Sequence, residues 1–281
     1  MQDAPEPPTL VEGPAASSLA EEPAAPAFPR YCSGCGAAWE AGWTGCPICA
    51  RRGDGSSAAK RTEEIEERPL RRSLSLYFAL LATSLAGVIA TISSGRPDGP
   101  AQLFIQWTVQ AVDTLLVFAW CLAARKDIAP LVRATSGLRW YAFAAAGSLA
   151  TFAVASLAVE GLVRTLGIEK MKLAEPVFEA GHGWPALLLM VSLQPAIVEE
   201  LAFRGVILGA LGRFLKPGEA VVVSSMMFMV LHLLPMSFPH LFLMGLALGF
   251  LRIRSGSIYP PILLHFLHNL YCVIAEVHGG P

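Results

Sequence analysis

Charged side chains are scarce in this chain. Asp, Glu, Lys and Arg make up 15% of its 281 residues, whereas hydrophobic residues make up 54%, and the mean hydropathy is +0.51. This composition excludes an ordinary soluble protein and is typical of a polytopic membrane protein. The net charge of −1 indicates no acidic or basic partner, so nucleic acid is not expected to bind. We therefore expect an all-α polytopic membrane protein whose main partner is the lipid bilayer.

The N-terminus lacks a recognisable signal peptide. Met1 leads into an acidic segment rich in Pro and Ala, with no basic stretch followed by an apolar one. Residues 1–29 have too few apolar side chains to fold alone, so we expect a disordered tail there. The first spanning helix would then act as an uncleaved insertion signal.

Cysteine is also sparse, but four of the six cysteines are clustered in two Cys-x-x-Cys pairs: Cys32 and Cys35, then Cys46 and Cys49. Four thiolates at this spacing are the ligands of a tetrahedral structural zinc site. Two disulfides or a reactive dithiol are the alternatives, and a reducing cytoplasm favours zinc. Residues 30–50 resemble the short zinc ribbons attached to many bacterial membrane proteins, and residues 51–72 are expected to form a linker.

The rest of the chain divides into apolar runs, and we count seven of them: about 73–94, 102–124, 140–163, 184–213, 218–235, 238–254 and 257–276. A membrane-spanning helix needs about 20 apolar residues, and tilt or protein contact allows shorter ones. The sequence therefore predicts about seven transmembrane helices, with N-terminal spans in 73–139 and a second group in 140–276.

Lys and Arg are distributed unevenly between the segments that join these runs. With the N-terminus inside, most of them fall on the inside, and four fall outside: Arg96, Arg164, Lys170 and Lys172. Basic residues accumulate in cytoplasmic loops. We therefore predict a multi-pass protein, of the bacterial inner membrane, with a cytoplasmic N-terminus and a cytoplasmic zinc ribbon.

The fourth run contains an unusual group of charges, Glu199, Glu200 and Arg204. Ionisable groups at membrane depth are costly and face a protein interior or a wet cavity. Glu200 and Arg204 are four residues apart and can pair on one helix face. Glu199 is rotated by about 100° from Glu200, which leaves it outside that pair.

Later apolar runs contain His232 and His265, with Asn269 one helical turn after His265. A free carboxylate, two histidines and an amide are suited to water activation and to binding an oxyanion. Taken singly, a histidine in a membrane is usually an interhelical hydrogen-bond partner, and the Glu200–Arg204 pair has a purely structural interpretation.

The second run carries a further polar face formed by Gln106, Gln110 and Asp113. We interpret it first as a source of interhelical hydrogen bonds. The alternative is a contribution to a hydrophilic cavity.

Taken together, the motifs Glu199-Glu200-x-x-x-Arg204, Phe228-x-x-x-His232 and His265-x-x-x-Asn269 resemble those of the CPBP intramembrane proteases. That family is also called CAAX proteases and bacteriocin-processing enzymes, or Abi. The resemblance covers roughly residues 140–276. It implies that Glu199 and His232 activate a water, and that His265 and Asn269 bind the oxyanion.

Glu200 and Arg204 would hold helices in register or bind substrate. Two histidines and a carboxylate would also suit a catalytic zinc ion, so a catalytic metal stays open. The absence of a His-Glu-x-x-His motif and the small number of ligands favour a metal-free mechanism.

The sequence thus predicts an intramembrane endopeptidase acting on a membrane-associated peptide or a lipidated protein. The alternative is a non-catalytic membrane partner or regulator that docks through the ribbon. A transporter with Asp113 and Glu199 as proton sites is a third reading.

Overall fold

The computed structural model describes residues 30–31, 38–39, 67–95, 100–167 and 172–279. The described residues 30–31 and 38–39 form a short antiparallel pair, β1 (Arg30–Tyr31) with β2 (Ala38–Trp39), in which Arg30 lies opposite Trp39. The four predicted zinc-ligand cysteines, the tail 1–29 and most of the linker lie outside the described residues. The zinc site therefore remains a prediction.

The described part of the chain from residue 67 onward is helical. Its elements are α1 (Arg68–Ser93), α2 (Pro100–Ala123), α3 (Arg125–Arg133), α4 (Leu138–Leu166), α5 (Glu175–Glu179), α6 (Trp184–Leu187), η2 (Leu188–Leu193), α7 (Gln194–Glu200), η3 (Leu201–Ile207), α8 (Leu208–Leu211), α9 (Pro217–Leu231), η4 (Pro235–Ser237), α10 (Phe238–Ser255) and α11 (Tyr259–His278). Elements α6 to α8 form one continuous helix, hereafter the central helix, in which η2 and η3 are π-helical turns.

Six of the described helices are long and apolar enough to cross a membrane, so a multi-pass membrane protein is supported. Each of the seven predicted runs contains a helix, but the fifth run forms only α9, which has 15 residues. At 1.5 Å per residue it extends about 22 Å, less than the ~30 Å hydrocarbon layer. The helix ends early because the chain turns at Leu233, whose φ is 53°. The described residues thus form six candidate spans and this shorter helix, which is close to the predicted count of about seven.

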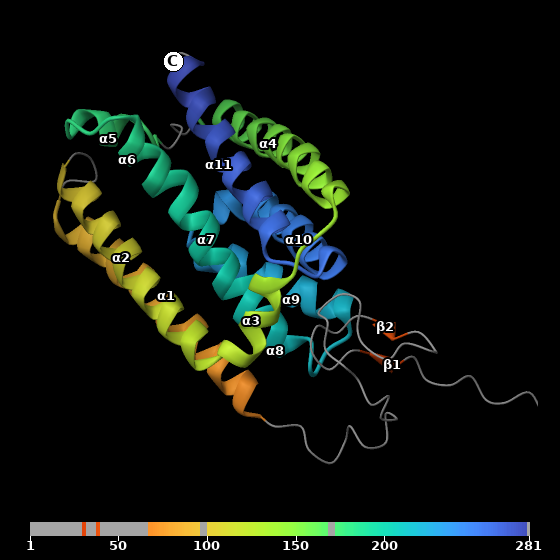
Figure 1. Cartoon of the computed structure of the whole chain (residues 1–281). Coiled ribbons are helices and arrows are strands. Elements are labelled where there is room, and N and C mark those ends of the chain that lie inside the picture. The colour runs from red at the N-terminus through yellow and green to blue at the C-terminus, as the bar shows by residue number, and fades with distance from the viewer. Residues whose placement is uncertain (1–29, 32–37, 40–66, 96–99, 168–171, 280–281) are drawn as a thin grey trace, which may run out of the picture.

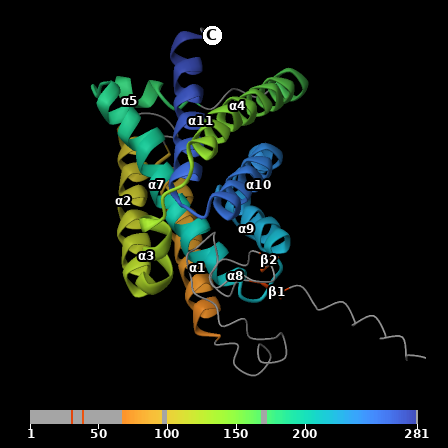
Figure 2. The ribbon, with the colours of Figure 1, turned by 45° about the vertical axis from the view of Figure 1, so that its right-hand side comes forward.

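Helices α1 and α2 pack as a hairpin on one side of the central helix, and α4, α10 and α11 lie on the other side (Figures 1 and 2). Helices α9 and α10 form a second hairpin. They approach closely because Gly245 and Gly249 face Ser225 and Val221; a Cβ atom added at either glycine would lie 2.8 Å from its neighbour's side chain. Small residues permit this kind of contact between membrane helices.

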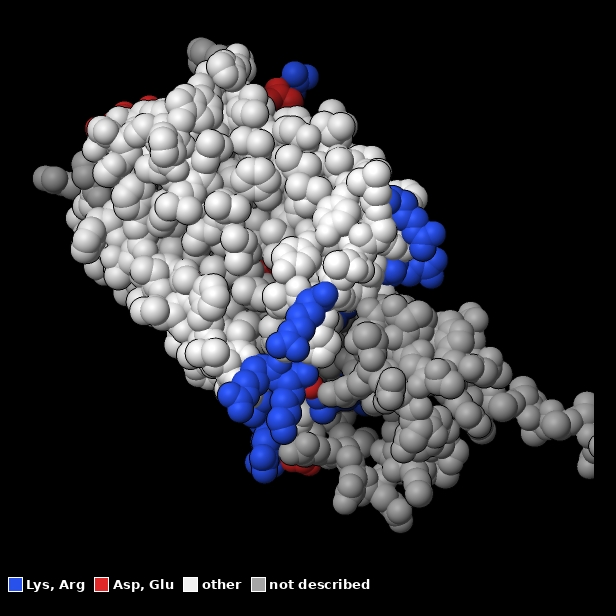
Figure 3. All heavy atoms as spheres, viewed as in Figure 1, with Lys and Arg blue, Asp and Glu red and all other residues white. Residues whose placement is uncertain are grey.

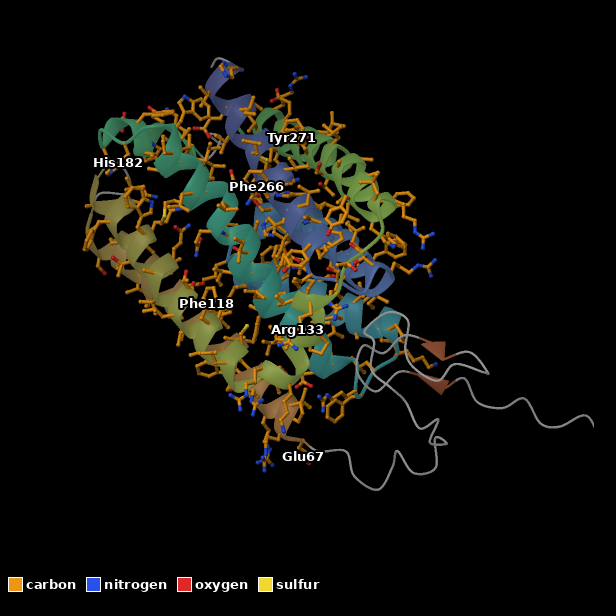
Figure 4. The ribbon with its side chains drawn as sticks, in the orientation of Figure 1. Glu67, Phe118, Arg133, His182, Phe266 and Tyr271 are labelled. Atoms are coloured by element: carbon orange, nitrogen blue, oxygen red, sulfur yellow. The ribbon has the colours of Figure 1, made fainter. Side chains whose placement is uncertain are left out.

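The amphipathic helix α3 was not anticipated from the sequence. It buries Ile128 and Leu131 against the bundle, while Arg125, Lys126 and Arg133 are exposed. Glu67 and Arg133 lie at one end of the bundle and His182 at the other (Figure 4). Figure 3 shows Lys and Arg gathered at the first end, beside a nearly uncharged belt. The bundle therefore has a basic end and an apolar middle that matches a hydrocarbon layer.

We propose that the basic end faces the cytoplasm. A reporter fused after Arg254, between α10 and α11, should then read cytoplasmic, and one fused after Pro281 should read external. Paired alkaline phosphatase and fluorescent-protein fusions measure both positions. The opposite pattern at both sites would reverse the orientation.

A carboxylate near the C-terminus of α11 anchors the segment that leads into α5. Glu276 accepts hydrogen bonds from the backbone N–H groups of Leu173, Ala174 and Glu175, at 2.8, 2.9 and 3.3 Å. Short helices need such partners for their first N–H groups. Behind this contact, Val177 packs into a small core at this end of the bundle.

Replacement of Glu276 by Ala should therefore loosen the 172–183 segment and cost about 1–3 kcal/mol of stability, because three N–H groups lose their acceptor. Limited proteolysis within 172–183 and thermal unfolding in detergent measure the two effects. The exposed residue Glu179 provides the matched control, and Glu179→Gln should change neither. Unchanged proteolysis of Glu276→Ala would contradict this role.

Candidate active site

The predicted site residues come from four parts of the bundle. Glu199 and Glu200 lie on α7, Arg204 lies on η3, His232 follows α9, and His265 and Asn269 lie on α11. The structure brings the first five together through direct contacts or short separations. It places Asn269 against the backbone of the central helix.

Glu200 is the centre of a buried polar network. Its Oε1 atom accepts hydrogen bonds from Nη1 of Arg204 and from Nδ1 of His265, both at 2.9 Å. Glu200 and Arg204 are 0% and 1% exposed. The i,i+4 pair expected from the spacing is therefore present, and it extends to α11.

Arg204 makes two further contacts that tie this network to the α9–α10 hairpin. Its Nη2 atom donates to the backbone carbonyl of Gly245 on α10 at 3.2 Å, and its guanidinium lies 4.6 Å from the ring centroid of Phe228 on α9. A guanidinium over an aromatic face is attractive in a desolvated setting. One charged pair thus connects the central helix, α9, α10 and α11.

Glu199 points away from that network. Its Oε2 atom lies 3.9 Å from Nε2 of His232 and 3.9 Å from Nε2 of His265, and it has no hydrogen-bond partner. The side chain is 26% exposed, in contrast to that of Glu200. The two adjacent glutamates therefore differ in environment. Glu200 is enclosed and hydrogen-bonded, whereas Oε2 of Glu199 accepts no hydrogen bond.

Both imidazoles are held in a defined orientation. Nδ1 of His232 lies 2.9 Å from the carbonyl oxygen of Phe228, and Nδ1 of His265 lies 2.9 Å from the Glu200 carboxylate. Each of these oxygens only accepts, so Nδ1 of each ring carries the proton. In the neutral rings, the Nε2 lone pairs then face Glu199.

Glu199 and His232 line a cavity of about 310 Å³ between the α1–α2 hairpin, the central helix and the end of α9. The remaining lining residues come mainly from α1 and α2 and include Gln106 and Asp113. His265 does not line the cavity, but its Nε2 lies 3.9 Å from Oε2 of Glu199. The Glu199 side chain thus borders the cavity, and its Oε2 atom is buried beside the two imidazoles.

The polar face of α2 divides its residues between two roles. Gln106 and Asp113 line the cavity, as the second interpretation of this face expected. Gln110 forms the interhelical bond expected by the first, because its Nε2 donates to the carbonyl of Met190 at 3.0 Å. In addition, Nε2 of Gln194 on the central helix donates a hydrogen bond to Oγ1 of Thr114 on α2 at 2.9 Å.

Pro195, which the sequence analysis did not single out, explains why side chains bind the central helix here. Proline has no N–H to offer the carbonyls four and five residues earlier, those of Val191 and Met190. Both carbonyls accept from side chains instead: Val191 from Nδ2 of Asn269 at 3.1 Å, and Met190 from Gln110. A proline inside an apolar helix is the sequence signal that could have indicated these contacts.

Three other histidines lie outside this group of side chains. His240 is half-buried in the first turn of α10, because that helix begins at Phe238. His182 is exposed and its ring contacts that of Trp107 at a tilt, with ring centroids 4.8 Å apart. His268 is buried, and its Nδ1 lies 3.0 Å from Oγ1 of Thr151 on α4.

In the described part of the chain, no group of three or more His, Cys, Asp or Glu side chains is arranged to hold a metal ion. The groups gathered around Glu199 Oε2 are its own carboxylate and the oriented imidazoles of His232 and His265. Such a set can bind a water, remove its proton and return that proton to a leaving group.

Comparison with known proteins is consistent with this chemistry. Residues 181–271, which include the six predicted catalytic residues, match the family model described as type II CAAX prenyl endopeptidase Rce1-like. The chain is also 32% identical over 96 residues to a putative membrane peptidase, YdiL, of Bacillus subtilis (strain 168). That alignment spans 33% of this chain and 38% of the relative, and no solved structure matches. The central helix and the segment through most of α11 are thus similar to membrane peptidases of the CAAX type.

Proposed function

We propose that this protein is an intramembrane endopeptidase that hydrolyses a peptide bond of a membrane-associated peptide or a lipidated protein. The observation that carries the proposal is the placement of Glu199. Its carboxylate oxygen lies 3.9 Å from two oriented imidazole nitrogens, beside a cavity, and Glu199 belongs to a helix long and apolar enough to cross a membrane. A costly ionisable group in such a position indicates a functional site.

The attacking group in this proposal is a water held between Glu199 and His232. Separations of 3.9 Å exceed a direct hydrogen bond and suit a bridging water. Glu199 takes a proton from that water as the water oxygen bonds to the peptide carbonyl carbon. The same carboxylic acid then protonates the leaving amine as the C–N bond breaks, which restores Glu199.

The tetrahedral intermediate carries an oxyanion, and His265 and Asn269 are the proposed donors. For this role Nε2 of His265 needs a proton, which the ring carries only when both nitrogens are protonated. Asn269 uses one N–H of its amide for the Val191 carbonyl and has a second one to offer. Donors placed before reaction are an effective way to stabilise such an intermediate.

The substrate class follows from the setting of the cavity. Its lining combines apolar side chains of α1 and α2 with the polar groups beside Glu199. This composition suits an extended peptide whose lipid or apolar anchor remains in the bilayer. The similarity to CAAX-type endopeptidases supports the same class.

A proteomic comparison of membranes tests the proposal. Cells carrying the wild type should contain membrane-protein fragments with new termini that are missing in cells carrying Glu199→Ala or His232→Ala at equal protein levels. Glu160 of α4, which pairs with Arg164 and does not line the cavity, supplies the control, and cells carrying Glu160→Gln should contain the wild-type fragments. Identical fragment sets in all four strains would favour a non-catalytic partner instead.

The N-terminal ribbon carries a separate proposal, one structural zinc ion bound by Cys32, Cys35, Cys46 and Cys49. A peptide of residues 25–55 should bind one zinc per chain and lose structure on chelation, because such modules fold only with metal. Metal analysis and circular dichroism measure both. Four cysteines that alkylate freely in the zinc-treated, full-length protein would contradict the site.

A further inference from the structure

The cavity wall opposite Glu199 contains a second carboxylate, Asp113. Leu80 and Ser84 of α1 and Gln106 and Asp113 of α2 line this wall. Residues four or seven apart share one face of a helix, so each helix presents a single face here. The α1–α2 hairpin thus contributes both apolar surface and an acidic group to the cavity.

Asp113 is held in place from the neighbouring helix. Oγ1 of Thr83 on α1 donates a hydrogen bond to Oδ1 of Asp113 at 2.5 Å. This bond joins the two helices of the hairpin and has a structural value of its own. A carboxylate has several acceptor positions, so the bond leaves capacity for a further donor.

The cavity has an acidic character. Asp113 and Glu199 both line it, and no Lys or Arg occurs among its lining residues. Arg204 is near in the chain, but it is 1% exposed and bound to Glu200 and to Gly245. Electrostatic interactions are strong in such a poorly solvated place. A substrate group near Asp113 therefore meets a negative electrostatic potential. Arg204 does not line the cavity and is already bound to Glu200.

We infer that Asp113 is a specificity-determining residue, which selects a cationic or N–H-donating substrate segment and disfavours a free carboxylate close to the scissile bond. The inference rests on the proposed peptidase function and names its substrate preference. Discrimination of this kind comes from an attractive contact with one ligand and repulsion of another. Thr83 acts as a positioning residue that fixes the Asp113 side chain.

The preference has a consequence for the cleavage site. A peptide that is cut next to its own C-terminal carboxylate would bring a third negative group into this cavity. An internal segment brings backbone N–H groups, from which the Asp113 carboxylate can accept a hydrogen bond. A segment with a basic residue brings a cation with which that carboxylate can pair. The expected substrates are therefore membrane-anchored chains cut away from a free C-terminus.

Three probes test this with the full-length protein in phosphatidylcholine nanodiscs, whose surface has no net charge. They are dye-labelled, N-palmitoylated octapeptides of one neutral sequence, ending in a carboxylate, a carboxamide or lysinamide. Fluorescence anisotropy gives the dissociation constants, and mass spectrometry of the same samples reads cleavage separately. We expect the wild type to bind the lysinamide probe at least about 10-fold more tightly than the carboxylate probe.

Asp113→Asn should reduce that ratio to about 3-fold or less, whereas Glu160→Gln, the control for a carboxylate that does not line the cavity, should keep it. Gln106→Lys provides a second variant that leaves the Thr83 bond intact, because Gln106 is exposed at the same cavity. It should lower the ratio as well. A purely structural role of Asp113 would change the melting temperature and not the ratio.

Two outcomes would overturn the inference: equal affinities of the wild type for all three probes, or an unchanged ratio in both Asp113→Asn and Gln106→Lys. A charge preference without cleavage of any probe would support the binding preference and count against the proposed peptidase. Cleavage without a charge preference would support the proposed peptidase and count against the binding preference of Asp113.

Discussion

Turnover should fall at least about 10²-fold when Glu199 is replaced by Gln, with little change in thermal stability. The amide keeps the shape of the side chain but has no oxygen that can take a proton from water. Stability should persist because Glu199 Oε2 has no hydrogen-bond partner to lose. A cleavage assay on a fragment-yielding substrate, together with thermal unfolding in detergent, measures both quantities.

Glu160→Gln is the matched control, since it removes a carboxylate of α4 that pairs with Arg164 and does not line the cavity, and it should retain full turnover. If Glu199→Gln retained wild-type turnover, a group other than Glu199 would be the base. Unfolding of the same variant would show that Glu199 is a structural partner instead.

Glu200→Gln should have the opposite signature, a stability loss on the order of 3 kcal/mol. Glu200 is fully buried and receives both Arg204 and Nδ1 of His265, so its neutralisation leaves a guanidinium without its counter-charge. Activity should fall because less protein is folded and because His265 loses the acceptor that orients it. Thermal unfolding in detergent, with turnover expressed per folded molecule, separates the two contributions.

The double variant Glu200→Gln with Arg204→Met should recover part of the lost stability, because both charges are removed together. The recovery should be incomplete, since the bond from Arg204 to the Gly245 carbonyl is also lost. If Glu200→Gln folds normally and is inactive while Glu199→Gln unfolds, the assignments of base and structural partner are reversed.

The distinction between the two glutamates has a simple origin in the helix. Consecutive residues are about 100° apart around the axis, so a Glu-Glu pair faces two different environments. One glutamate faces Arg204 and His265 in the interior, and the other faces the cavity. A single helical turn therefore provides both the reactive carboxylate and the charge pair that holds its surroundings together.

The sequence by itself determined the features that depend on neighbouring residues. Apolar runs located the helices, because a helix in lipid satisfies its backbone hydrogen bonds internally. The spacing of Glu200 and Arg204 predicted their pair, since residues four apart meet on every α-helix. The resemblance of three motifs indicated the type of enzyme and the residues to examine.

The tertiary structure alone decided how these helices meet. The 3.9 Å separations around Glu199, the bond from Asn269 to Val191 beside Pro195, and the position of Asp113 in the same cavity join residues far apart in the chain. The early end of α9, just before His232, could not be predicted either, because the apolar run continues to residue 235. Helical periodicity specifies which face a residue occupies. The neighbour of that face depends on packing between helices, where Gly245 and Gly249 permit close contact and Pro195 frees backbone carbonyls for distant side chains.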